Sequence, residues 1–402
     1  MAAASPAEPP TAAAPTPAPA PTPASDHCCA PAATSACAAC RGAVYCNKTC
    51  QAAAWQSHKA LCRALRAPPA PPAPPATTPA KYAVMLKVAE AGNADAQFAV
   101  GECLAAGAGV AADAAAAAAW YARAAAAGHA GAALNLGVAY ESGAGVAENA
   151  RTAVKWYRAA ADRGLPAAQV NLALAYATGD GVGRDSREAL RLFRLAAEAQ
   201  HPVAQYHLGD CYKEGTGVVA DAVESVRWFA LAAAAGDADS QYELGTAYDT
   251  GAGVEKDEAE AVKWYMRAAD GGSADAAYNL GHSYMQGEGV EADAAVAVAW
   301  WRRAADLGSG EACVNLGVCR TEGNGVEADA AAAFAWFQKA ADLEAGADAL
   351  FALAECHAAG SGTPRNAAEA ARLFAEARDA GHPEAAARLA AVAAVPVVAE
   401  MD

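Results

Sequence analysis

The stretch "LGTAYDTGAGVEKDEAEAVKWY", from Leu244 to Tyr265, decides the fold, because its pattern returns along most of the chain. Its Gly-x-Gly loop begins at Gly251. Similar loops begin at Gly107, Gly143, Gly179, Gly215, Gly287, Gly323 and Gly360. Neighbouring loops are 36 residues apart six times and 37 residues apart once. The longer interval contains "DLEAGAD", Asp342–Asp348, where a turn can absorb one extra residue. A period of this length is typical of a helical repeat protein.

Each unit is predicted to consist of two helices joined by the loop. In the first helix, Leu244 and Tyr248 share one face, and Gly245 allows a neighbouring helix to approach closely. The loop glycines end this helix, because glycine takes a positive φ without strain. Asp257 then has the place of an N-cap for the second helix. The other units have Asp or Asn at the same position: Asp113, Asn149, Asp185, Asp221, Asp293, Asp329 and Asn366.

The second helix carries a pair of large residues that its periodicity assigns to the core. The pairs are Trp120/Tyr121, Trp156/Tyr157, Leu192/Phe193, Trp228/Phe229, Trp264/Tyr265, Trp300/Trp301, Trp336/Phe337 and Leu373/Phe374. Four cysteines of the first helices, Cys103, Cys211, Cys319 and Cys356, occupy a position where other units have Ala or Ser. Cys313 shares a second position with Ala and Gln. We therefore expect these cysteines to be small buried side chains.

This pattern resembles the Sel-one-like repeat (SLR), a helical-hairpin relative of the tetratricopeptide repeat, over about 300 of the 402 residues. The resemblance implies an all-α fold, an α-solenoid of about eight units whose first helices line a concave, protein-binding surface. Stacking is also required physically, since one hairpin cannot bury its own apolar face. The segment from Lys81 supplies a preceding second helix, and the segment after Gly381 supplies a closing helix.

One polar stripe of the first helices is a candidate partner-binding surface. It changes among Asn, His and Glu between apolar neighbours, at Asn135, Asn171, His207, Glu243, Asn279 and Asn315. The hypothesis is that these side chains contact a peptide or a partner helix. The alternative is an ordinary polar surface stripe. No Ser, Cys, Asp or Glu stands at a reproducible catalytic spacing to a histidine of the repeats, so we expect no enzyme active site there.

A second group of cysteines precedes the repeats, in "DHCCAPAATSACAACRGAVYCNKTCQAAAWQSHKALC". Cys37 and Cys40 form a Cys-x2-Cys knuckle, while Cys46 and Cys50, and His58 and Cys62, each place two ligands one helical turn apart. A disulfide framework would leave the histidine unexplained. The spacing therefore predicts structural zinc, which would also supply folding energy to a segment too short for its own core.

The ending "YC...CQ...W..HK..C", from Tyr45 to Cys62, resembles the MYND-type zinc finger. The resemblance implies two cross-braced zinc ions. Cys37, Cys40, His58 and Cys62 would hold one ion, and Cys46 and Cys50 would belong to the other. The family expects a Cys-x2-Cys pair at the start, where this chain has Asp26, His27, Cys28 and Cys29. We assign Cys28 and Cys29 to the second ion, while His27 and Asp26 remain alternatives, and the number of ions stays open between one and two.

Composition limits the remaining possibilities. Residues 27–66 contain five Lys/Arg and no Asp/Glu, whereas residues 67–402 contain 24 Lys/Arg and 43 Asp/Glu. An acidic array repels nucleic acid. No uninterrupted apolar run approaches the roughly 18–20 residues of a membrane helix. The first 25 residues fit neither a secretory signal nor an Arg-rich transit peptide, so we expect a cytoplasmic or nuclear protein, although a plastid address stays compatible with their composition.

The predicted organisation is a disordered Ala/Pro-rich tail (1–25), a zinc finger (26–66), a Pro-rich linker (67–80), a repeat array (81–395) and a short tail (396–402). Two interaction modules on a spacer predict a non-enzymatic adaptor or scaffold that binds proteins through finger and groove. The alternative is a RING-like ubiquitin ligase or a substrate adaptor of a ligase complex. The sequence does not predict the partners or the oligomeric state.

Overall fold

The structure of the chain is a computed structural model that describes residues 77–393 and two short strands, 35–36 and 44–45. The chain divides into two units, Met1–Arg66 and Ala67–Asp402. Of the first unit, the structure describes β1 (Ser35–Ala36) and β2 (Val44–Tyr45), which pair antiparallel with Ser35 opposite Tyr45. The predicted tail, linker and most of the finger lie outside the described residues.

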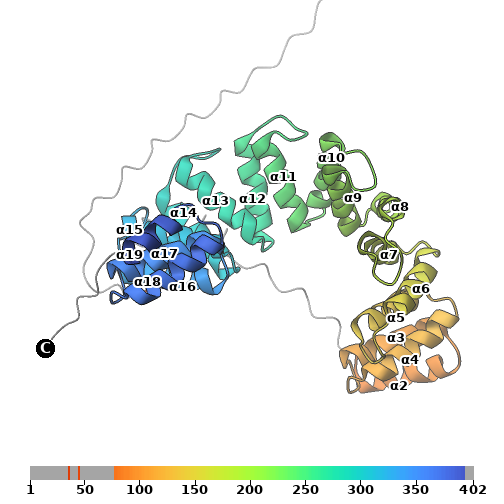
Figure 1. Ribbon diagram of the computed structural model, residues 1–402. Coiled ribbons are helices and arrows are strands. Elements are labelled where there is room, and N and C mark those ends of the chain that lie inside the picture. The colour runs from red at the N-terminus through yellow and green to blue at the C-terminus, as the bar shows by residue number, and fades with distance from the viewer. Residues whose placement is uncertain (1–34, 37–43, 46–76, 394–402) are drawn as a thin grey trace, which may run out of the picture. The chain divides into compact units, whose positions relative to one another are not determined.

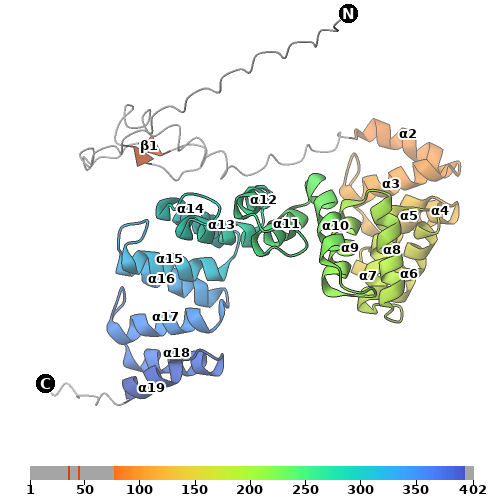
Figure 2. The same cartoon turned by 90° about the horizontal axis from the view of Figure 1, so that it is seen from above.

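The second unit is all-helical over residues 77–393, as predicted (Figures 1 and 2). We call the helix before each Gly-x-Gly loop, together with α19, a first helix, and we call the helix after each loop, together with α2, a second helix. The first helices are α3 (Ala94–Ala106), α5 (Ala130–Ser142), α7 (Pro166–Thr178), α9 (Pro202–Glu214), α11 (Ala238–Thr250), α13 (Ala274–Gln286), α15 (Gly310–Glu322), α17 (Gly346–Ala359) and α19 (Ala385–Ala393). The second helices are α2 (Pro79–Glu90), α4 (Ala114–Ala126), α6 (Ala150–Ala161), α8 (Ser186–Glu198), α10 (Ala222–Ala234), α12 (Glu258–Asp270), α14 (Ala294–Asp306), α16 (Ala330–Asp342) and α18 (Ala367–Asp379).

Each helix packs against the helix before it and the helix after it, so the array is a solenoid. In Figure 1, α5, α7 and α9 lie on the inner side of the bend that the chain makes there, and α6, α8 and α10 lie on its outer side. None of the helices within residues 77–393 has the length and apolar character needed to cross a bilayer.

The helix ends follow the sequence signals. All eight predicted Asp and Asn N-caps have extended backbone and accept hydrogen bonds from amides of the next helix, as Asp257 does from the Glu260 amide at 2.9 Å. The first loop glycine is the C-cap, with φ of 77° at Gly251. The extra residue lies between α16 and α17, where Glu344 takes a φ of 55°. These local predictions are confirmed.

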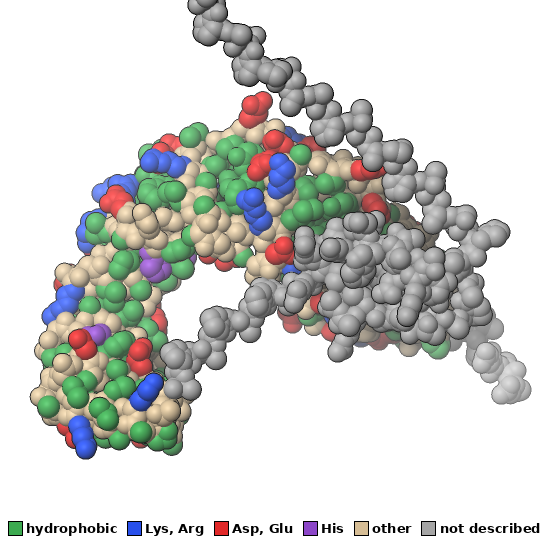
Figure 3. Space-filling model, turned by 180° about the vertical axis from the view of Figure 1, so that it is seen from behind, with side chains coloured by type: hydrophobic (Ala, Val, Ile, Leu, Met, Phe, Trp, Pro, Cys, Tyr) green, Lys and Arg blue, Asp and Glu red, His purple; other side chains and the backbone are tan. Residues whose placement is uncertain are grey.

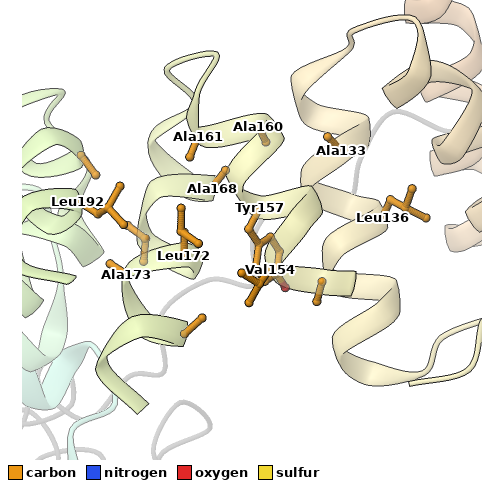
Figure 4. Packing of buried hydrophobic residues seen from close by; sticks show 14 of the residues in the cluster. Ala133, Leu136, Val154, Tyr157, Ala160, Ala161, Ala168, Leu172, Ala173 and Leu192 are labelled. Carbon is orange, nitrogen blue, oxygen red and sulfur yellow. The ribbon is translucent and has the colours of Figure 1, made fainter. Parts of the chain in front are cut away.

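The buried core lies between first and second helices. In Figure 4, Tyr157 and Val154 of α6 lie between α5, which carries Leu136, and α7, which carries Leu172. The glycine after Leu136 permits this packing, because a Cβ added to Gly137 would lie 2.5 Å from Cε1 of Tyr157. The five cysteines of the array are buried and free, as predicted.

The prediction that these pairs belong to the core is correct for both members of Leu192/Phe193, Trp300/Trp301 and Leu373/Phe374, and for the second member of the other five pairs. The second member is buried in every unit, whereas among the tryptophans of the first position only Trp300 is buried. The other tryptophans, Trp120, Trp156, Trp228, Trp264 and Trp336, are half-buried. Four of these five stack with a nearby cation, as Arg267 does with Trp264 at 4.2 Å. Adjacent residues of a helix point in different directions, so in these five units the tryptophan lies at the edge of the core while the second member points into it.

Candidate interaction surface

The predicted zinc ligands, Cys28, Cys29, Cys37, Cys40, Cys46, Cys50, His58 and Cys62, lie outside the described residues. The donor set fits structural zinc, since seven thiols and one imidazole within residues 28–62 are the ligands that Zn²⁺ prefers. Among the residues that the structure describes, no three His, Cys, Asp or Glu side chains gather as a further metal site.

The six residues of the predicted partner-binding stripe are all half-buried and occupy one register position on α5, α7, α9, α11, α13 and α15. Three of them interact with a tyrosine hydroxyl of the preceding second helix. Asn135, Asn171 and Asn279 partly offset the rise that burial causes in the pKa of the tyrosine fourteen residues earlier, at Tyr121, Tyr157 and Tyr265. These asparagines therefore lie at the joint between one unit and the next.

The other three stripe residues follow an aromatic residue without a hydroxyl, and their contacts differ. His207 stacks on Phe193 with 4.9 Å between ring centroids. Glu243 accepts a hydrogen bond of 2.9 Å from Nζ of Lys213, on α9. The amide of Asn315 lies 3.4 Å from Nε2 of His282. The contacts of the stripe residue thus differ between units that have Tyr and units that have Phe or Trp fourteen residues earlier.

Burial sets the protonation of the groups around the stripe. Desolvation lowers the pKa of His207, so its imidazole is neutral at pH 7. Desolvation also raises the pKa of the Cys211 thiol to about 11, with Asp210 adding to the effect. A thiol that stays protonated is a poor nucleophile. The Cys211 thiol therefore lacks the reactivity of an activated nucleophile.

Grooves run beside the stripe at the same register in different units. One groove, of about 190 Å³, lies among α4, α5 and the end of α3, and its lining includes Tyr121 and Asn135. A second, of about 280 Å³, lies three units later, where Phe229 and Glu243 occupy the equivalent positions. A third, of about 200 Å³, is at the end of the array, where Arg388 of α19 has the stripe position and forms an ion pair of 3.0 Å with Glu355.

The residue three positions after the stripe lines the first two grooves, as Val138 and Thr246, and was not predicted from the sequence. We call this position the groove row; on α5 to α15 it comprises Val138, Leu174, Asp210, Thr246, His282 and Val318. Val138, Leu174 and Val318 are 41%, 36% and 40% exposed, which is high for aliphatic side chains on a packed helix. The signal was present in the 36-residue period, as a position that varies from Val and Leu to Asp, Thr and His.

Comparison with known proteins supports the predicted order of a zinc finger followed by helical repeats. A family model of the Sel1 repeat matches eight consecutive segments: 94–129, 130–165, 166–201, 202–237, 238–273, 274–309, 310–344 and 347–382. The chain belongs to the Sel1 repeat family. A family model of the MYND finger matches residues 26–62, so a zinc-binding finger precedes the repeats. No curated protein matches the chain.

Two solved structures share the array's fold. The chain is similar to c5321, a protective antigen of uropathogenic Escherichia coli strains with an SLR fold, at 33% identity and a TM-score of 0.70, covering 77% of this chain and 67% of that one. It is also similar to a Sel1 repeat protein from Oxalobacter formigenes, at 30% identity and a TM-score of 0.62, covering 80% of this chain and 95% of that one. Sel1 repeats and MYND fingers generally mediate protein interactions, and Sel1 repeat proteins are typically not enzymes.

Proposed function

We propose that the protein is a zinc-binding adaptor whose MYND finger binds one protein partner and whose groove row binds another. One observation carries the second half of this proposal: register-equivalent grooves of about 190 and 280 Å³ recur along the array, with Ala at three equivalent lining positions, an aromatic residue at a fourth and a variable groove row. A variable position on a constant scaffold is what selective recognition of a peptide or helix requires.

The finger is proposed to hold two zinc ions, with ligands divided as the MYND resemblance implies. The antiparallel ladder supports this division, because β1 and β2 end at opposite ends of the ladder. Cys37 follows β1 in the sequence and Cys46 follows β2, and these two cysteines are assigned to different ions. Zinc, when bound, supplies folding energy to the finger.

We place the adaptor in the cytoplasm or the nucleus. The five cysteines of the array are free thiols, which agrees with a reducing compartment. The stripe residues remain part of the proposed surface, since Asn135 and Glu243 line grooves. Their interactions with neighbouring units make them poor sites for a first test, because their loss would also loosen the array.

The groove row gives a cleaner test. Proximity labelling with the full chain would compare the natural protein with a His58→Ala version and with a Val138→Glu/Leu174→Glu version. We expect each version to lose a different set of partners. Val219→Glu is the matched control, since Val219 lies in a loop and is 86% exposed. The proposal would be wrong if the groove-row version kept every partner. A ubiquitin ligase would replace the adaptor if the natural protein ubiquitinated itself in an assay with conjugating enzymes and Cys37→Ser abolished that activity.

A further inference from the structure

Charge is divided between the two kinds of helix. The eight first helices α3 to α17 contain thirteen Asp/Glu and only two Lys/Arg. The eight second helices α4 to α18 contain fifteen Lys/Arg and eleven Asp/Glu. In Figure 3, Lys and Arg side chains gather along the left edge of the visible face, the side on which Figure 1 places α6, α8 and α10. The first helices, along which the grooves lie, therefore carry a net negative charge as a group.

The cations of the second helices have roles within the array. Arg303 reaches back from α14 to α12, where it contacts the carbonyl of Ala269 and pairs with Asp270. Lys339 donates similarly to the carbonyl of Ala305 at 3.1 Å. Such contacts satisfy carbonyls in the last turn of the preceding second helix and favour its dipole. These side chains join neighbouring units.

The two Lys/Arg residues of the first helices α3 to α17 also have partners within the array. Lys213 pairs with Glu243 at 2.9 Å, and Nη1 of Arg320 donates to the carbonyl of Glu327 at 3.0 Å. In contrast, Asp239 and Asp275 are exposed, and neither forms an ion pair within residues 77–393. These two carboxylates are thus left for solvent or for a partner.

The face formed by α9, α11 and α13 combines these carboxylates with aromatic rings. Tyr206, Tyr242 and Tyr278 occupy one register position and are half-buried. Burial raises the pKa of each hydroxyl. Nearby carboxylates raise it further: Asp210, Glu243 and Asp239 for Tyr206, Asp275 for Tyr242 and Glu311 for Tyr278. A tyrosine ring beside a carboxylate favours a Lys or Arg side chain through cation–π and ionic attraction.

The neighbouring face of α5 and α7 has the opposite character. Val138 and Leu174 are its exposed groove-row residues, and no charged side chain lines the adjacent groove. The hydroxyl of Ser142 donates to the carbonyl of Val138 at 2.8 Å, and Thr178 donates to the carbonyl of Leu174 at 3.0 Å. Both hydroxyl protons are already used, so this end of the surface favours apolar side chains.

Building on the proposed adaptor function, we infer that the groove row from α5 to α13 binds a partner segment that is apolar at one end and carries Lys or Arg at the other. The apolar end lies on α5 and α7, and the basic end lies on α9, α11 and α13. Complementary charge both speeds the encounter and fixes the direction of the bound segment.

A designed peptide tests this inference with the full chain. The probe is a fluorescein-labelled 15-residue peptide with three leucines followed by three arginines, separated by alanines, and its partner has glutamine in place of arginine. Fluorescence anisotropy at 50 mM and 300 mM NaCl should show saturable one-to-one binding of the arginine peptide that weakens with salt. The glutamine peptide should bind much more weakly.

Matched variants separate a specific surface from the general negative charge of the protein. Asp239→Asn/Asp275→Asn should weaken binding of the arginine peptide by about 2- to 30-fold, as expected for two partly exposed charge pairs. The control, Glu255→Gln/Glu291→Gln, removes two exposed loop acids from the same two units and should leave affinity within about twofold. Circular dichroism would verify that both proteins keep the helical fold.

Three results would overturn the inference. The first is an equal loss in both double variants, which would mean that only net charge matters. The second is equal binding of the glutamine peptide, or no binding of either peptide. The third is self-association abolished by Asp239→Asn/Asp275→Asn but not by added peptide, which would make a second copy the occupant. The adaptor proposal is tested separately, since it depends on partners lost by Val138→Glu/Leu174→Glu.

Discussion

The substitution Gly281→Ala, which adds one methyl group, is a sharp test of how the second helix packs on the first. It follows Leu280 on α13 and faces the ring of Trp301, on α14. A Cβ added to Gly281 would lie 2.2 Å from Nε1 and 2.3 Å from Cδ1 of that ring. Ordinary contacts between such atoms are about 3.5–4.0 Å, so Gly281→Ala requires the ring to move by more than 1 Å.

Trp301 has little freedom to move. Its side chain is 4% exposed, and its Nε1 donates to the carbonyl of Tyr278 at 3.1 Å. Overpacking of this kind costs about 1–3 kcal/mol, and loss of the hydrogen bond costs about 0.5–1.5 kcal/mol more. Alanine gains about 1 kcal/mol over glycine inside a helix. The net expectation is a loss of roughly 2 kcal/mol in the free energy of unfolding.

Urea unfolding of the full chain, followed by tryptophan fluorescence, would measure this loss. Because a repeat array need not unfold in a single step, hydrogen exchange of the α13 and α14 amides should locate the change. Gly131→Ala is the control: it lies in the first turn of α5, its nearest atom would be Cε1 of His129 at 3.1 Å, and stability should stay equal or rise. A Gly281→Ala protein as stable as the natural one would refute the close packing of ring on helix.

Three further predictions follow from the caps, the thiols and the finger. Asp293→Ala removes the acceptor for the Ala295 and Val296 amides and should cost about 1 kcal/mol, measured by urea unfolding, whereas Asp293→Asn should cost much less. Cys211, with a pKa of about 11, should stay protonated below that pH and resist iodoacetamide at pH 8 in the folded chain, as followed by mass spectrometry; rapid alkylation would contradict its burial. Metal analysis of the reduced protein should find two zinc ions per chain, and a value of one that Cys46→Ser leaves unchanged would show that only the Cys37 site is intact.

The sequence predicted what local chemistry determines. Asp257 and its equivalents are N-caps because the carboxylate and the amides that it serves lie within three residues of each other. Gly251 ends its helix for a similarly local reason. The place of the extra residue, beside Glu344, was predictable because it is the one interval that breaks the period.

Contacts between units were harder to predict. The pairing of Asn171 with Tyr157 depends on how α7 packs on α6, which no single helical period contains. Part of this pairing is visible in the sequence, because the Asn stripe residues follow a Tyr or Trp by fourteen positions, whereas His207 and Glu243 follow a Phe. The finer burial of the tryptophans, with Trp300 covered and Trp264 half-exposed, also depends on neighbouring units.

The difference between the stripe and the groove row bears directly on function. A stripe residue such as Asn279 is coupled to Tyr265 of the preceding unit, so replacing it alters the joint between two hairpins. A groove-row residue such as Val138 is 41% exposed, and its replacement alters mainly the surface. Each unit of a solenoid contacts only its neighbours, so an exposed groove-row residue such as Val138 or Leu174 can vary at little cost in stability, whereas His282 also contacts Asn315 of the next unit. That freedom makes the groove row, rather than the stripe, the position where this array can acquire a preference for one partner.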